Sequence, residues 1–122
     1  MIKFEVEGRP MSWNIAHSGR HWAVRMKMND QMKWRVKAAL MKYRVPRKPI
    51  TQSVRILFVA YVGRPIDCDN IMLKTYIDGM REWGLLPDDS PKWVTEINVK
   101  VITKNSTREW MEVIVDTELE NL

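Results

Sequence analysis

The apolar run at residues 54–62 constrains the fold of this chain more than any other feature. It reads VRILFVAYV, and its β-branched and aromatic residues are interrupted only by one arginine. A short apolar run of this composition, bounded by turn residues, predicts a strand. Nearly continuous hydrophobicity is typical of strands that are buried on both faces. We therefore expect residues 54–62 to form a central strand that is covered on both sides.

Three further segments have the pattern of strands. Residues 2–7 alternate between apolar and charged side chains, which predicts a half-buried strand. Residues 94–102 also alternate. Residues 110–115 follow a polar turn and predict a last strand that is antiparallel to the one before it.

Two segments have helical periodicity. In the first, Asn29 is a suitable N-cap and Pro46 blocks continuation. In the second, Asp69 is the expected N-cap, Gly84 is the expected C′ residue and Pro87 follows it. The residues expected on the buried faces are Met32, Val36, Ala39, Leu40 and Tyr43 in the first helix and Leu73, Tyr76, Ile77, Met80 and Trp83 in the second.

The elements follow the order β-α-β-α-β-β, and no repeat, low-complexity tract or linker divides them. The sequence therefore predicts an α+β fold in which one mixed sheet packs with two helices. A chain of 122 residues is long enough to bury a core of its own, so we expect residues 1–122 to form a single domain.

The chain is basic, with a formal net charge of +5. A positive field favours nucleic acid or an anionic membrane surface as a partner. Residues 9–28 predict a long basic loop, in which Trp13 and Trp22 either stack on bases or anchor the loop. The cations of this loop, of the first helix and of the segment after it form the predicted nucleic-acid-binding surface: Arg9, Arg20, Arg25, Lys27, Lys33, Lys37, Arg44, Arg47 and Lys48.

Composition excludes several other classes of protein. The single cysteine, Cys68, permits no internal disulfide and fits a reducing cytoplasm. No apolar run approaches the length of a membrane span, about 18 residues, so we expect no membrane partner. The two histidines, His17 and His21, are too few for a zinc site, and no Gly-rich phosphate loop is present.

An acidic segment stands out against this basic background. Its acids and their polar neighbours are Asp67, Asp69, Asn70, Lys74, Asp78, Asp88 and Asp89. Carboxylates repel one another and repel phosphate, so their concentration in a basic chain indicates a divalent cation held against a polyanion. If residues 67–69 are extended, the carboxylates of Asp67 and Asp69 point the same way and can share one cation.

Each of these acids also has a structural interpretation. Asp69 fits a helix cap, and Asp78 fits an ion pair with Lys74 or Arg81. The acids at 88–89 fit a turn, and they reach the first pair only if their loop returns along the sheet. The sequence leaves these alternatives open.

Taken together, the acidic residues resemble the motif of the RusA family of Holliday-junction resolvases. The family pattern is D-x-D-N at a strand-to-helix junction, a lysine and an aspartate on the helix, and then a glycine and paired aspartates. The Gly-x-Pro turn at residues 8–10, the basic loop and the basic helix agree with the family as well. The resemblance covers most of the chain, and its specific part is residues 67–89.

This resemblance implies a homodimeric endonuclease that cuts paired strands of four-way DNA junctions, with Mg²⁺ or Mn²⁺, in DNA recombination and repair. Such enzymes are often encoded by phages or prophages. The resemblance assigns Asp67, Asp69 and Asp89 to catalysis through the metal and Lys74 to catalysis as a cation. A homodimer also follows from the reaction, because two coordinated cuts need two sites of matching symmetry.

One departure from the family concerns Lys74. It follows Asp69 by five positions, whereas four are common in the family. An added helical residue rotates a side chain by about 100°. Either the helix begins one residue later and Lys74 stays in place, or Lys74 points elsewhere. We favour the first alternative, because Lys74 keeps its i, i+4 relation to Asp78.

Three other functions remain open at the level of sequence. The first is a DNA-binding module without catalysis, in which the aspartates are structural. The second is a nuclease of the same chemistry that acts on forks, flaps or RNA hybrids. The third is a structural interaction protein, for which no salt-sensitive DNA binding is expected.

Overall fold

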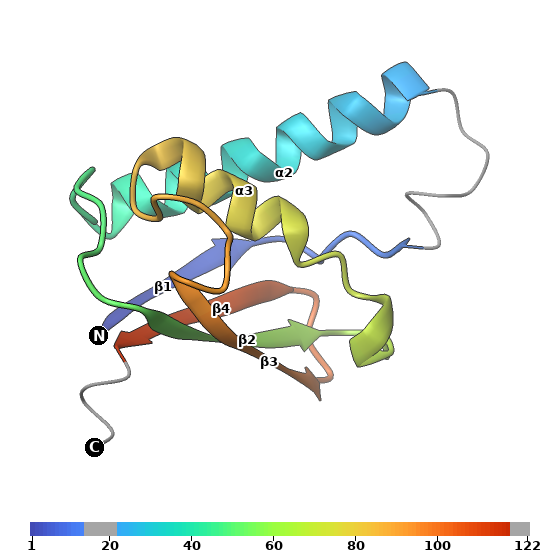
Figure 1. The fold of residues 1–122 in the computed structure, drawn as a ribbon. Helices are drawn as coiled ribbons and strands as arrows, with labels where there is room; N and C mark the ends of the chain where they lie inside the picture. The colour runs from blue at the N-terminus through green and yellow to red at the C-terminus, as the bar shows by residue number, and fades with distance from the viewer. Residues whose placement is uncertain (14–21, 118–122) are drawn as a thin grey trace.

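The computed structural model describes residues 1–13 and 22–117, which form one four-stranded sheet with both helices on the same face (Figure 1). The elements are β1 (Ile2–Glu7), α2 (Trp22–Lys42), β2 (Val54–Val62), the 3-10 turn η1 (Cys68–Asn70), α3 (Lys74–Trp83), β3 (Val94–Thr103) and β4 (Trp110–Thr117). The predicted α+β class and element order are confirmed.

The strand order in the sheet is β1-β4-β2-β3. β2 is parallel to β3, and β4 is antiparallel to both of its neighbours, so the sheet is mixed. The last two strands run in opposite directions as expected, but β2 lies between them and they form no hairpin. Val113 of β4 explains this order, because it lies opposite Phe4 on one side and Phe58 on the other. All three side chains are buried on the face that the helices cover.

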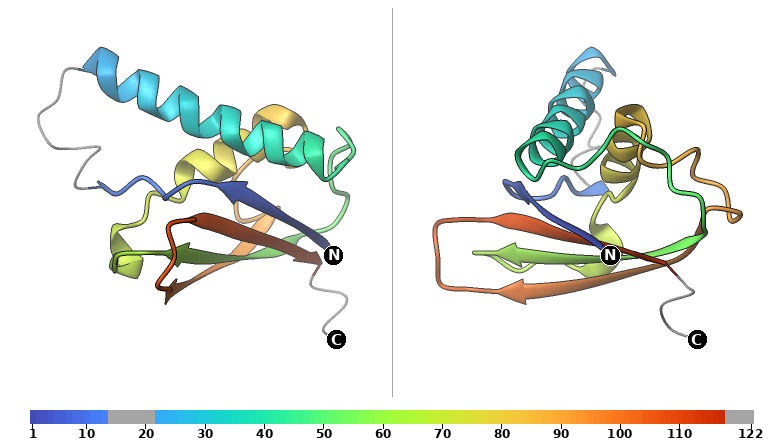
Figure 2. Two further views of the ribbon diagram at one scale, coloured as in Figure 1. Left: turned by 180° about the vertical axis from the view of Figure 1, so that it is seen from behind. Right: turned by 90° about the vertical axis from the view of Figure 1, so that its left-hand side faces the viewer.

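Residues 54–62 form a central strand, but the expectation that it is covered on both faces is wrong. Both helices pack on one face of the sheet (Figure 2). On the other face Leu57 and Tyr61 are only partly buried. Tyr61 stacks on Trp110 of β4, with ring centroids 4.5 Å apart. Side chains of the neighbouring strands therefore shield this face in place of a second layer of helices or strands.

Helix α2 is longer at its N-terminus than predicted. It begins at Trp22, so Asn29 is not its N-cap and residues 22–28 are not part of a loop. The segment consists mostly of strong helix formers, which extend the helix without a cap at Asn29. The predicted buried residues are confirmed from Met32 to Leu40, whereas Tyr43 is 40% exposed. The predicted loop residues at 14–21, which include Arg20, lie outside the described residues.

Helix α3 begins at Lys74 with Leu73 as its N-cap, so the prediction that Asp69 caps it is wrong. Its end is as predicted, because Gly84 is left-handed, with φ of 100°. The N–H of Leu85 then donates to the carbonyl of Met80 at 3.0 Å, a bond typical of this kind of helix end.

Gly79 lies where the two helices meet. A Cβ atom at this position would lie 2.8 Å from Cβ of Val36 on α2, closer than real Cβ contacts. Close packing within the chain therefore explains a glycine in the middle of a helix.

Candidate functional site

The segment between β2 and α3 carries the D-x-D-N acids, and two sets of hydrogen bonds hold it in place. Before the acids, Arg9 donates to the carbonyls of Arg64 and Pro65 at 3.0 and 3.4 Å. After them, the N–H of Met72 donates to the carbonyl of Met11 at 2.8 Å. Both anchors come from the residues that follow β1, so the acidic segment has a fixed position relative to the sheet.

Arg9 also forms an ion pair with Glu109 inside the fold. Its guanidinium lies 2.8 Å from the Glu109 carboxylate, which also accepts the N–H of Gly63 at 2.9 Å. Burial opposes ionisation of Glu109, but these two donors together hold its pKa below the usual value. Arg9 was predicted to bind nucleic acid, and the structure gives it a role in fixing the acidic segment.

Asp67 and Asp69 lie on either side of the start of a turn. Asp67 has an extended backbone, and Asp69 lies within η1, where the N–H of Asn70 donates to the carbonyl of Asp67 at 2.9 Å. Residues 67–69 are therefore not extended throughout, so the condition from which we inferred that both carboxylates point the same way is not met. Both aspartates are exposed, so their carboxylates are open to a ligand.

The loop after α3 returns to the start of that helix. Leu85 and Leu86 anchor it, with exposed fractions of 1% and 2%. Oδ2 of Asp89 then lies 4.0 Å from Nζ of Lys74, which is also 3.9 Å from Oδ1 of Asp78. Lys74 therefore lies beside Asp78 and Asp89, although α3 begins at Lys74 itself, later than the first alternative assumed.

Asp78 and Asp88 have the structural roles that the sequence left open. Asp78 is paired with both Lys74 and Arg81, the latter at 3.4 Å. Asp88 accepts the N–H of Ser90 at 2.7 Å and so forms a turn. Hydrogen bonds from Ser90 lower the pKa of Asp88. Of the two adjacent aspartates, Asp89 is the one that faces Lys74.

The acids of the site have the donor chemistry of a hard cation. Mg²⁺ prefers oxygen ligands and usually takes one or two carboxylates together with water and substrate phosphate. Within residues 1–13 and 22–117, no three side chains of His, Cys, Asp or Glu come together as a group that could hold a metal. The exposed aspartates therefore do not form a complete protein cage for a metal within these residues.

Two of the predicted nucleic-acid contacts join the helices to each other. Lys33 and Lys37 of α2 lie 3.0 and 2.9 Å from the carboxylate of Glu82 on α3. Hydrogen bonds from Lys37 and Lys33 lower the pKa of Glu82, and its carboxylate raises the pKa of Lys33. These lysines contribute less free positive charge than the sequence indicated.

Most of the other cations predicted to contact nucleic acid are exposed to solvent. Lys27, Arg44 and Lys48 are exposed. Arg47 is exposed as well, and its guanidinium lies 3.9 Å from the ring centroid of Trp83. Arg25 lies on α2 and is partly buried.

The two tryptophans of the predicted loop also differ from each other. Trp13 packs against the core, whereas Trp22 is 59% exposed.

No protein-family model and no curated protein sequence matches this chain. None of the helices in the described part of the chain combines the length and the hydropathy that crossing a membrane requires.

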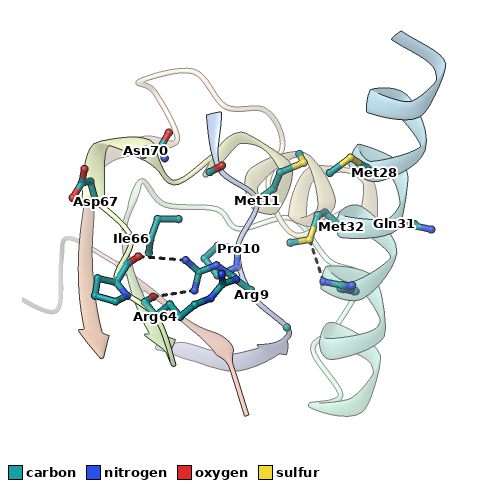
Figure 3. A pocket seen from close by; sticks show the side chains of 14 residues that line it. Arg9, Pro10, Met11, Met28, Gln31, Met32, Arg64, Ile66, Asp67 and Asn70 are labelled. Carbon is teal, nitrogen blue, oxygen red and sulfur yellow. Dashed lines mark hydrogen bonds between the residues drawn. The ribbon is translucent and has the colours of Figure 1, made fainter. Parts of the chain in front are cut away.

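Sequence reasoning missed a cleft beside Asp67, with a volume of about 690 Å³ (Figure 3). Its walls come from three segments that are far apart in the chain, so no local pattern marks it. The sequence feature that could have indicated the cleft is Arg64, a cation three positions before Asp67.

Proposed function

We propose that this protein is a metal-dependent endonuclease that resolves four-way DNA junctions by paired, symmetric cuts. The observation that carries the proposal is the contact between Lys74 and Asp89. It brings together a lysine and an acid that the RusA motif assigns to catalysis and that all of α3 separates in the sequence. The net charge of +5 supports a polyanionic substrate.

The proposed roles follow from the chemistry of each side chain. Asp67, Asp69 and Asp89 would hold Mg²⁺ or Mn²⁺ together with a phosphate of the substrate. When bound, such an ion lowers the pKa of an attacking water and polarises the phosphate. The ammonium of Lys74 stabilises negative charge that develops on the phosphate, while Asp78 and Asp89 orient it.

The exposed cations supply the affinity for DNA in this proposal. Lys27, Arg44, Arg47 and Lys48 are open to phosphates. Contacts of this kind give binding that weakens with salt and that carries little sequence readout. We therefore expect selection of a branched structure and no strong sequence preference in binding.

A homodimer is part of the proposal, because resolution requires two cuts related by a two-fold axis. The helices leave one face of the sheet uncovered (Figure 2), and that face is available to a second copy. Sedimentation with a four-way junction present tests this point. Two protomers per junction agree with the proposal, and a monomer at micromolar concentration contradicts it.

A panel of substrates tests the function as a whole. The protein is incubated with Mg²⁺ or Mn²⁺ and a labelled four-way junction, a fork, a flap, an RNA hybrid and a linear duplex. Paired nicks placed symmetrically near the crossover of the junction support resolution. Cutting confined to forks, flaps or hybrids keeps the chemistry and changes the substrate.

A DNA-binding module without catalysis is the second candidate. It is favoured by the finding that no three acids of the described residues form a metal-holding group. Tight binding to the junction without cutting in either metal, and no uptake of Mn²⁺ by calorimetry, would establish this function instead. An interaction protein would show no salt-sensitive shift of DNA in a gel.

A further inference from the structure

The cleft beside Asp67 is a candidate binding site in its own right. It lies between the residues after β1, the middle of α2 and the segment before η1 (Figure 3). Its volume of about 690 Å³ falls within the range typical of small-molecule sites, about 300–1,000 Å³. It opens next to the acidic segment, so its occupant lies beside the proposed catalytic residues.

One side of the cleft is formed by methionines. Met11 and Met32 are 6% and 5% exposed, and Met28 packs against the core (Figure 3). Ile66 adds an apolar side chain from the opposite wall. Thioethers are polarisable and adaptable, and sulfur makes favourable contacts with aromatic rings. This surface fits a flat, apolar or aromatic group better than a sugar or a peptide backbone.

Two arginines of the cleft form no ion pair with a described acid. Among the described residues, neither Arg35 nor Arg64 has a carboxylate within 4.0 Å, whereas Arg9 in the same cleft is paired with Glu109. Arg35 lies against Gly8, where a Cβ atom would be 2.6 Å from its Nη1. The glycine thus leaves room for the guanidinium, which also donates to the sulfur of Met32 at 3.5 Å. Guanidinium groups bind phosphate oxygens through paired hydrogen bonds.

We propose that this cleft receives one unstacked nucleotide of the DNA, with its base on the methionines and its phosphate on Arg35 and Arg64. The inference deepens the proposed function, on which it rests for the identity of the nucleic acid. Nucleotides at a branch point suit such a site, because unstacking is least costly where pairing is already disturbed. A base held in the cleft fixes the register of the strand relative to Asp67.

The first test uses the junction without catalysis. A junction with 2-aminopurine at one crossover position is bound in EDTA, where no cutting occurs. We expect fluorescence to rise several-fold with the wild type, because the base leaves its stack. Arg35→Ala and Met28→Glu should reduce the rise by more than half, and Lys42→Ala, which removes an exposed cation at the last residue of α2, should not. An equal rise in all four proteins contradicts the proposal.

The second test does not depend on junctions. Methyl signals of methionines labelled with ¹³C are followed while dAMP is added, and inorganic phosphate serves as the control ligand. We expect ring-current shifts at Met11, Met28 and Met32 with dAMP alone, and their loss in Arg35→Ala. Absence of these shifts at millimolar dAMP, or equal shifts with phosphate, overturns the nucleotide assignment.

The two proposals fail in different ways. Shifted methyl signals with an uncut junction would support the nucleotide site and contradict the proposed resolvase activity. A cut junction without a change in 2-aminopurine fluorescence would support the resolvase activity and contradict the nucleotide site.

Discussion

Nζ of Lys74 lies 4.0 Å from Oδ2 of Asp89, although the whole of α3 separates these residues in the sequence. The contact exists because Gly84 ends the helix and two buried leucines hold the following loop against the body of the protein. It places a cation between the carboxylates of Asp78 and Asp89, which limits the orientations of the ammonium. A lysine held in this way suits the stabilisation of a phosphate in a reaction.

Removal of the Lys74 ammonium should impair catalysis much more than binding. We expect Lys74→Ala to lower the rate of junction cleavage by about 10²–10³-fold, the usual effect of losing one group that stabilises transition-state charge. Single-turnover cleavage and gel shifts in EDTA separate the two effects. Lys42→Ala, at the last residue of α2, removes the same charge and should cut normally. Equal rates in the two variants would contradict the role of Lys74.

Neutralising the exposed acids should remove cleavage and leave binding intact. Asp67→Asn and Asp69→Asn each replace a proposed anionic ligand by a neutral amide. Both side chains are exposed, so we expect little change in fold stability. Junction affinity should stay the same or rise slightly, because repulsion of phosphate is reduced. Junction cleavage and a gel shift in parallel test this. Retained cleavage in both variants would contradict the assignment of a metal to these residues.

Gly79→Ala should destabilise the protein despite the higher helix propensity of alanine. Alanine gains about 1 kcal/mol in an exposed helix. Here the new methyl group would lie 2.8 Å from Val36, and overpacking of this kind costs about 1–3 kcal/mol. We expect a net loss of about 1 kcal/mol in the free energy of unfolding, measured with urea.

The partner of Gly79 supplies the control. Gly79→Ala should be tolerated better when it is combined with Val36→Ala, because the overlapping atoms are then absent. A gain in stability from Gly79→Ala alone would contradict the close packing of the two helices.

The ion pairs of Glu82 should make stability depend on pH. Hydrogen bonds from Lys37 and Lys33 depress the folded-state pKa of Glu82 below its ordinary value of 4.5. The unfolded state therefore binds the proton more readily, so the stabilisation is present above pH 4.5 and is lost as the pH falls through the folded-state pKa.

Glu82→Gln tests this pH dependence. The side chain of Glu82 is 37% exposed, so we expect the substitution to cost only about 0.2–1 kcal/mol at pH 7. The difference from the wild type should shrink below pH 4.5, as measured by urea unfolding across the pH range. A difference that grows towards acid pH would have the wrong sign for these ion pairs.

Local signals predicted much of this fold. The apolar run of β2 and the left-handed Gly84 were recognisable because each depends on residues near it in the sequence. The place of β4 in the sheet was not recognisable, because Val113 lies opposite Phe4 and Phe58, which are distant from it in the sequence. The early start of α2 was missed because Asn29 fits a cap that the helix does not use.

For the candidate site too, some features follow from residues that are close in the sequence and others only from the fold. The resemblance singled out Asp89 of the two adjacent aspartates, but only the fold shows that Asp89 lies beside Lys74. Charge alone also did not show which cations are paired within the fold. Glu82 and Glu109 are distant in sequence from the cations that they pair with, so their effect appears only in the fold.

The most direct test compares the two adjacent aspartates, Asp88 and Asp89. Asp88→Asn and Asp89→Asn remove the same charge from the same loop, but only Asp89 faces Lys74, whereas Asp88 accepts the N–H of Ser90. The measurement is cleavage of a labelled four-way junction in Mg²⁺ by the wild type and both variants. We predict paired, symmetric nicks by the wild type and by Asp88→Asn, and none by Asp89→Asn. Cleavage by Asp89→Asn at the wild-type rate would contradict the site.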